Sequence, residues 1–199
     1  ARTCLGEHGL STLVSAAVHS GNLVAATRPQ PSDTFVICAP TPVTPGKAVD
    51  ISAVESAARA LLPCLRTGNL VILESTSPVG ATRNVVGGVL RAGGFEPGRD
   101  VSLCYCPERV LPGNTVSELI NNDRIIGGIT PACAQRALAV YQRFCQGRIS
   151  LTDDRTAEMC KLMENTCRDV NIALANSFAR IAEDAGVNVW EAISLTNLH

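Results

Sequence analysis

The sequence has no run of about 18 apolar residues, which is the length that a membrane-spanning helix requires. Its formal net charge is only −1, so no strong electrostatic field marks a surface for nucleic acid or an anionic membrane. Hydrophobic residues make up 46% of the chain and charged residues 18%, a balance typical of a folded globular protein. We therefore expect neither nucleic acid nor a membrane among its partners.

Metal-binding patterns are also absent. There is no C-x-x-C, and His8, His19 and His199 are far apart in the sequence, so we expect no metal site. The nine cysteines are an odd number and lie mostly in apolar segments. We interpret most of them as small buried residues of a protein kept in a reducing cytoplasm, rather than as disulfide partners.

A third absence concerns the glycines. None of the 16 glycines forms even a G-x-G, so the chain has no G-x-G-x-x-G. Those glycines let the backbone of a dinucleotide-binding unit approach a pyrophosphate at a helix N-terminus. The chain also opens with a predicted helix at residues 10–19, where such a unit opens with a strand. Either the fold is different, or the first strand–helix–strand unit is missing.

Short apolar segments alternate with helical patterns along the first 150 residues. This alternation predicts a parallel sheet covered by helices on both faces. The predicted strands are residues 34–39, 69–74, 101–106, 124–129 and 148–151. The predicted helices between and after them are residues 51–65, 81–92, 131–144 and 188–198.

Residues 152–186 form the longest predicted element, a helix of roughly 30 residues or about 45 Å. Apolar residues recur along it at spacings of three and four, which predicts one buried face. These residues are Met159, Met163, Cys167, Val170, Leu174, Phe178, Ile181 and Ala185. Oxygens at residues 152–154 offer an N-cap, and Gly186 offers a stop. A helix this long is expected to bridge two units or two subunits.

Polar residues gather at four places on this scaffold. Lys161, Asn165 and Arg168 form a polar strip along the long helix. Residues 40–42, 75–77 and 107–109 follow three predicted strands, at the edge where parallel sheets bind ligands. We expect these loops and the strip to line one crevice. The alternatives are a solvated helix face with Lys161 paired to Glu158 or Glu164, a turn closed by a salt bridge, and hydroxyl–backbone bonds at strand ends.

Four segments carry a resemblance to a known family. They are residues 39–42 (APTP), 74–80 (ESTSPVG), 105–113 (YCPERVLPG) and 158–171 (EMCKLMENTCRDVN). In this order and spacing they resemble the UDP-sugar 6-dehydrogenases of the UDP-glucose/GDP-mannose dehydrogenase family. The wording of the last two segments favours the branch that acts on UDP-N-acetyl-D-mannosamine.

The resemblance implies an activity and an architecture. Members of this family oxidise the C6 alcohol of a UDP-sugar to a carboxylate with two NAD+. The implied fold class is α/β, a Rossmann-like parallel sheet lacking its first βαβ and followed by a long central dimerisation helix. Residues 1–151 would be a partial NAD-binding domain, and residues 152–199 the central helix and the start of a middle helical domain. The implied partners are a UDP-sugar and a second copy joined through the 152–186 helix.

The resemblance also implies roles for single residues. Thr41 and Thr76 match positions that contact NAD. Lys161 matches the acid/base lysine, Glu108 a glutamate implicated in acid/base work and hydrolysis, and Asn165 a donor to the developing oxyanion. The implied substrate-binding residues are Arg109, Val110, Lys161, Asn165, Arg168 and His199.

The chain departs from the family in one respect that bears on its chemistry. The family's nucleophilic cysteine belongs to a glycine-rich loop beyond the position that His199 matches, and none of the nine cysteines matches it. We expect a fragment that does not by itself complete the oxidation. The alternatives are a non-catalytic dimerising or sugar-nucleotide-binding protein, a 6-dehydrogenase of UDP-glucose or UDP-N-acetylglucosamine, and a β-hydroxyacid-type dehydrogenase.

Overall fold

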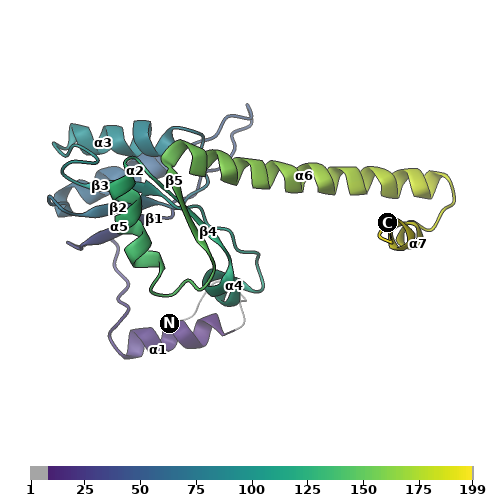
Figure 1. Cartoon of the computed structure of the whole chain (residues 1–199), viewed down its shortest axis with the longest axis horizontal. Coiled ribbons are helices and arrows are strands. Elements are labelled where there is room, and N and C mark those ends of the chain that lie inside the picture. The colour runs from purple at the N-terminus through teal and green to yellow at the C-terminus, as the bar shows by residue number, and fades with distance from the viewer. Residues whose placement is uncertain (1–8, 199) are drawn as a thin grey trace. The chain divides into compact units, whose positions relative to one another are not determined.

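The computed structural model describes residues 9–198 and divides the chain into two compact units, the first ending at Lys161 and the second beginning at Leu162 (Figure 1). The expected role of His199 falls outside the described residues. The helices of the first unit are α1 (Leu10–His19), α2 (Ser52–Leu61), the 3-10 turn η1 (Leu62–Cys64), the π-helix η2 (Thr82–Val86), α3 (Gly87–Ala92), α4 (Thr115–Asn121) and α5 (Pro131–Tyr141). Its strands are β1 (Thr34–Ile37), β2 (Leu70–Leu73), β3 (Ser102–Tyr105), β4 (Arg124–Gly128) and β5 (Ile149–Asp153). Helix α6 (Asp154–Asp184) continues into the second unit, which also holds α7 (Val189–Thr196).

The five strands form one sheet in the order β1-β2-β3-β4-β5. The pairs β1–β2, β2–β3 and β4–β5 are parallel, which confirms the predicted α/β fold class. The pair β3–β4 is antiparallel, so the prediction of an entirely parallel sheet was wrong for this pair. The reason is the connection, which contains only the short α4 that the sequence pattern did not reveal. An antiparallel neighbour needs no crossover helix, whereas a parallel one does.

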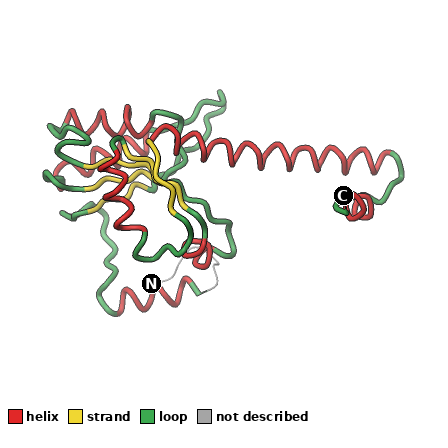
Figure 2. Tube along the Cα trace, viewed as in Figure 1, coloured by secondary structure: helices red, strands yellow, loops and turns green. Residues whose placement is uncertain are grey.

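Both faces of the sheet are covered, and each carries its own core (Figure 2). One core joins β1, β2 and β3 to α2, η2 and α3. The other joins β2, β3 and β4 to α5. Strands β2 and β3 are buried along their whole length, which explains why both read as continuous apolar runs. Their carboxyl ends lie side by side and position the loops that follow.

Helix α5 begins for the expected reason, whereas α2 ends earlier than the predicted helix 51–65. Pro131 stands at the first position of α5, where its missing N–H costs nothing, and the Thr130 hydroxyl accepts from the Cys133 N–H. Helix α2 stops at Leu61, since Pro63 follows in a 3-10 turn. The predicted helix 81–92 is a π-helix that continues as α3.

The long helix α6 has its expected caps but not its expected buried face. Asp153 accepts from both the backbone N–H and the hydroxyl of Thr156, and Gly186 adopts φ +66° beyond the helix. The predicted apolar stripe is exposed in this chain, with Met163 58% and Phe178 57% exposed. The positions buried against the sheet unit are instead Asp154, Ala157, Glu158 and Lys161, at i, i+3, i+4 and i+7. The apolar stripe is therefore not part of the core of this chain, and the helix face that packs on the sheet unit carries three charged residues among its four buried positions.

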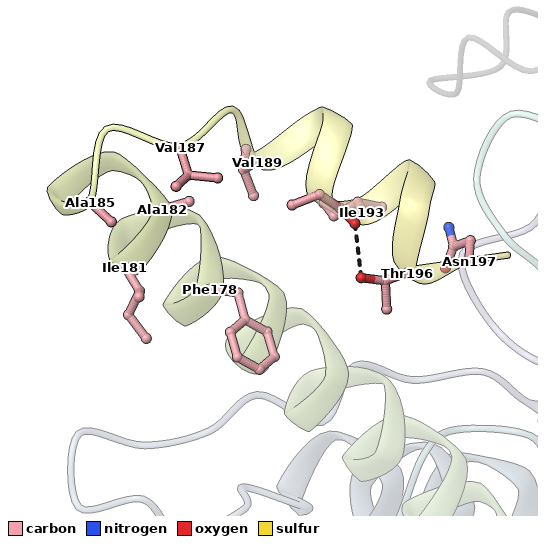
Figure 3. A pocket seen from close by; sticks show the side chains of 10 residues that line it. Phe178, Ile181, Ala182, Ala185, Val187, Val189, Ile193, Thr196 and Asn197 are labelled. Carbon is pink, nitrogen blue, oxygen red and sulfur yellow. Dashed lines mark hydrogen bonds between the residues drawn. The ribbon is translucent and has the colours of Figure 1, made fainter. Parts of the chain in front are cut away.

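The second unit consists of the rest of α6 and the short α7, which Asn188 caps through the Trp190 N–H. A cavity of about 430 Å³ lies between the two helices (Figure 3). Its lining is almost wholly apolar and includes Phe178 and Ile181 from α6 and Val189 and Ile193 from α7. Within the part of the chain that the structure describes, no helix is long and apolar enough to cross a bilayer.

Candidate functional site

The loops after β1 and β2 are joined by side-chain hydroxyls. The Thr41 hydroxyl donates to the Thr76 carbonyl at 2.7 Å, and the Ser75 hydroxyl donates to the Ala39 carbonyl at 2.7 Å. Thr41 and Thr76 are half-buried. The structure thus brings together the two residues expected at a cofactor, at the carboxyl edge of parallel strands. The Thr41–Thr76 bond is also a hydroxyl–backbone bond at a strand end, which is what the alternative without a cofactor predicts.

The loop after β3 is fastened at several points. Arg109 donates from its guanidinium to the Asp123 carbonyl at 2.8 Å, and the Asn122 side-chain amide donates to the Arg109 carbonyl at 3.0 Å. The Glu108 carboxylate accepts from the Val110 N–H and is otherwise exposed. The loop is therefore held through both the side chain and the carbonyl of Arg109, with the Glu108 side chain at the surface.

Lys161 reaches this loop from α6. Its ammonium donates to the Glu108 carbonyl at 2.5 Å, and the residue is only 7% exposed. The alternative of an ion pair with Glu158 does not fit, because both Glu158 oxygens accept from backbone N–H groups elsewhere. An amine at the end of a flexible four-carbon stem is thus held at the carboxyl edge of β3, next to the loop that carries Glu108.

Two acidic residues of α6 were missed as parts of this arrangement. Asp154, which the sequence suggested as an N-cap, is fully buried and pairs with Arg83 at 2.6 Å. Glu158 is also fully buried, and it accepts from the Gly80 N–H at 2.5 Å and the Thr82 N–H at 2.8 Å. Desolvation raises the pKa of Glu158, and the two amide bonds oppose that rise. A signal for both was present in the sequence. Asp154, Glu158 and Lys161 are spaced i, i+4 and i+7, which puts them on one face of the helix.

Asn165 and Arg168 belong to the second unit, where Asn165 is half-buried and Arg168 exposed. Among the described residues, no group of three or more histidine, cysteine, aspartate or glutamate side chains could hold a metal ion. The eight described cysteines are all free thiols, of which Cys104, Cys106, Cys133 and Cys145 are buried.

Comparison with known proteins shows which family has this architecture. Residues 2–145 match the model of the UDP-glucose/GDP-mannose dehydrogenase family, NAD binding domain, and residues 155–199 match that family's central domain. UDP-D-ManNAc dehydrogenase from Pyrococcus horikoshii has a similar structure, with a TM-score of 0.94 and 42% identity over 100% of this chain and 48% of that one. The sheet and long helix are those of Rossmann-like dehydrogenases. The chain belongs to the UDP-glucose/GDP-mannose dehydrogenase family, as its motifs indicated.

Two curated relatives show how far the likeness extends. The NDP-N-acetyl-D-galactosaminuronic acid dehydrogenase of Ralstonia solanacearum is 50% identical over 100% of this chain and 49% of its own length. The UDP-N-acetyl-D-mannosamine dehydrogenase of Escherichia coli (strain K12) is 48% identical over 97% of this chain and 48% of its own length. The chain therefore spans about half the length of the curated relatives it matches.

Proposed function

We propose that this chain is part of an enzyme for the NAD-dependent oxidation of the C6 alcohol of a UDP-sugar, with UDP-N-acetyl-D-mannosamine as the substrate and its uronate as the product of the full-length enzyme. Without a match to the family's nucleophilic cysteine, the chain alone does not complete the oxidation. The observation that carries the proposal is the buried Lys161 ammonium at 2.5 Å from the Glu108 carbonyl. The relatives named for N-acetylated sugar nucleotides support an N-acetylhexosamine over glucose.

Lys161 has the chemistry that the alcohol requires. When a hydride leaves an alcohol carbon, the oxygen must lose its proton, so a base is needed within hydrogen-bond reach. In this proposal the Lys161 amine takes that proton. When no substrate is bound, the Glu108 carbonyl orients the amine.

NAD+ would accept the hydride when bound, and Thr41 and Thr76 are the proposed contacts to it. Their loops fit that role, because they follow parallel strands whose carboxyl ends face the same edge. The glycine-rich cradle for a pyrophosphate is not among the residues of this sequence. The two threonines are therefore assigned contacts to NAD, and no phosphate contact is assigned.

The remaining roles follow the motifs of the family. We assign Glu108 to acid/base work and hydrolysis, and Asn165 to stabilising the oxyanion. The proposed substrate contacts are Arg109, Val110, Lys161, Asn165, Arg168 and His199. Residues 1–151 are the proposed NAD-binding part, and residues 152–199 the proposed central part. The free thiols of the eight described cysteines suit a protein of the reducing cytoplasm.

We further propose a homodimer joined through the 152–186 helix. The exposed apolar residues of its second-unit part, among them Val170, Leu174 and Phe178, would form the seam. Sedimentation at micromolar concentration should give a dimer for the parent chain and a monomer for Leu174→Asp. A monomeric parent, or a dimeric Leu174→Asp, would remove the seam from the proposal.

Ligand-dependent thermal unfolding tests the function. Only ligands that bind the native state raise the midpoint, and a concentration of 100 times Kd adds about 2.7 kcal/mol of stability. We expect UDP-N-acetylmannosamine to raise the midpoint more than UDP-glucose, and NAD+ to raise it separately.

The chain offers a matched control because it contains two lysines, Lys47 and Lys161. Lys47 lies on an exposed loop. Lys161→Met should lose most of the UDP-sugar effect, whereas Lys47→Met should keep it. No UDP-sugar effect in the parent would contradict the function, and an effect that persists in Lys161→Met would favour a sugar-nucleotide-binding module without this chemistry.

A further inference from the structure

Glu158 is a buried carboxylate whose position is fixed by the backbone of another segment. It is fully buried, and its two oxygens accept separately from the Gly80 and Thr82 N–H groups. These amides stand just before and at the start of η2, where N–H groups have no partner within a helix. The second turn of α6 is thereby attached to the end of the loop that carries Thr76.

This attachment is energetically demanding, which argues for a specific role. A carboxylate removed from water loses its hydration, and the pKa of Glu158 is raised mainly for this reason. An apolar residue would avoid the desolvation of a carboxylate, but it would leave the Gly80 and Thr82 N–H groups without this acceptor. What a carboxylate adds is two directional bonds that set the distance between helix and loop.

Lys161 lies three residues further along the same face of α6. It is 7% exposed and donates to the Glu108 carbonyl in the loop after β3. Successive contacts on one helix face therefore tie α6 first to the loop after β2 and then to the loop after β3. The Lys161 stem has a limited reach, so the amine contacts the Glu108 carbonyl only while the helix backbone is held close to that loop.

We infer that Glu158 is a positioning residue, which holds the second turn of α6 against Gly80 and Thr82 and so places the Lys161 amine at the Glu108 carbonyl. The inference rests on the proposed function in that Lys161 is taken as the working amine. Glu158 touches neither substrate nor cofactor in this role.

Lysine reactivity tests the positioning directly. With two lysines in the sequence, acylation by trace acetic anhydride can be followed at Lys161 and at Lys47 in one sample by peptide mass spectrometry. Glu158→Gln should raise the Lys161 rate by about tenfold, roughly the factor of one lost hydrogen bond to a charged group. The Lys47 rate should not change. Glu158→Asp keeps the charge at shorter reach and should give an intermediate rate.

The control is Glu183→Gln, the same change at an exposed position of the same helix. It should alter neither lysine. A folded Glu158→Gln variant with a lower Tm and an unchanged Lys161 rate would overturn the inference, since the carboxylate would then be only structural. If Glu158→Gln fails to fold, as judged by circular dichroism, the rate in Glu158→Asp decides.

The outcome is independent of the proposed function, because the acylation is done without ligand. A parent chain that binds neither UDP-sugar nor NAD+ would count against the function. The ratio of the two lysine rates would still support or overturn the positioning role.

Discussion

Arg83 and Asp154 form a two-pronged ion pair, with the guanidinium Nη2 at 2.6 Å and Nε at 3.2 Å from the two carboxylate oxygens. The Asp154 side chain is fully buried, whereas the Arg83 side chain is 40% exposed. The pair joins the start of η2 to the first residue of α6. An ion pair therefore attaches the N-terminus of the long helix to the helix that follows β2.

Loss of this pair should destabilise the first unit. Arg83→Ala leaves a buried carboxylate unpaired, and we expect the free energy of unfolding to fall by about 3 kcal/mol, the low end for a broken buried pair because Arg83 is partly solvated. Urea unfolding measures the change. Arg155→Ala removes an exposed arginine next to Asp154 and should change stability by less than about 0.5 kcal/mol. Equal effects of the two variants would contradict the importance of the pair.

The Thr41–Thr76 hydrogen bond should contribute to stability and to the proposed NAD site. Thr41→Val keeps the shape but removes the hydroxyl, which should cost about 1 kcal/mol in unfolding free energy. In titrations followed by thermal shift, the NAD+ effect should fall as well. Thr27→Val, at an exposed position, serves as the control. A Thr41→Val variant that binds NAD+ like its parent would remove Thr41 from the cofactor contacts.

Asp100 should make stability depend on pH in the acid range. Its hydrogen bond with Arg99, and then the Glu96 N–H, lower its pKa to about 2 from the usual 3.8. A carboxyl with a lowered folded-state pKa stabilises the fold above its unfolded pKa, and that stabilisation is lost as the pH falls toward about 2.

Comparison of thermal midpoints between pH 2 and pH 5 checks this expectation. The difference between the parent and Asp100→Asn should shrink as the pH falls through that window. Asp184→Asn, an exposed residue at the end of α6, should give a difference that stays flat. A parent and an Asp100→Asn variant with parallel curves would show that Asp100 does not carry the dependence.

Cys38 should be a slow thiol although the residue is exposed. Desolvation of the thiol and the Glu74 carboxylate, 3.4 Å from the sulfur, raise its pKa to about 12. Glu74 also accepts from the Tyr141 hydroxyl at 2.5 Å, which holds the carboxylate in place. Glu74→Gln removes the charge but keeps the burial, so part of the rise should remain.

Iodoacetamide labelling at pH 8.5, read by peptide mass spectrometry, measures the effect. The Cys38 rate should increase by about tenfold in Glu74→Gln, the equivalent of one pKa unit. Cys167, an exposed cysteine on α6, should label at the same rate in both proteins. An unchanged Cys38 rate would show that desolvation alone keeps the thiol protonated.

The sequence by itself determined most of the elements, though not α4, and the family. Continuous apolar runs predicted the strands that became β2 and β3, because strands buried on both faces need apolar residues at every position. The capping residues predicted where α5 and α6 begin. This was possible because Pro131 and Asp153 affect only residues within the first turn of each helix. The motifs around Thr76, Glu108 and Lys161 were long enough to indicate the family that the comparisons confirmed.

Only the tertiary structure decided which charged residues are buried and what they contact. The direction of β4 depends on the path of the chain around α4, which no local pattern encodes. Glu158 looked like a surface partner for Lys161, yet its partners are amides 78 and 76 residues away in sequence. A helical period indicates which residues share a face, but it does not say which face meets the sheet. For α6 the polar face with Asp154, Glu158 and Lys161 meets it, because the loops after β2 and β3 present N–H and carbonyl groups that apolar side chains cannot satisfy.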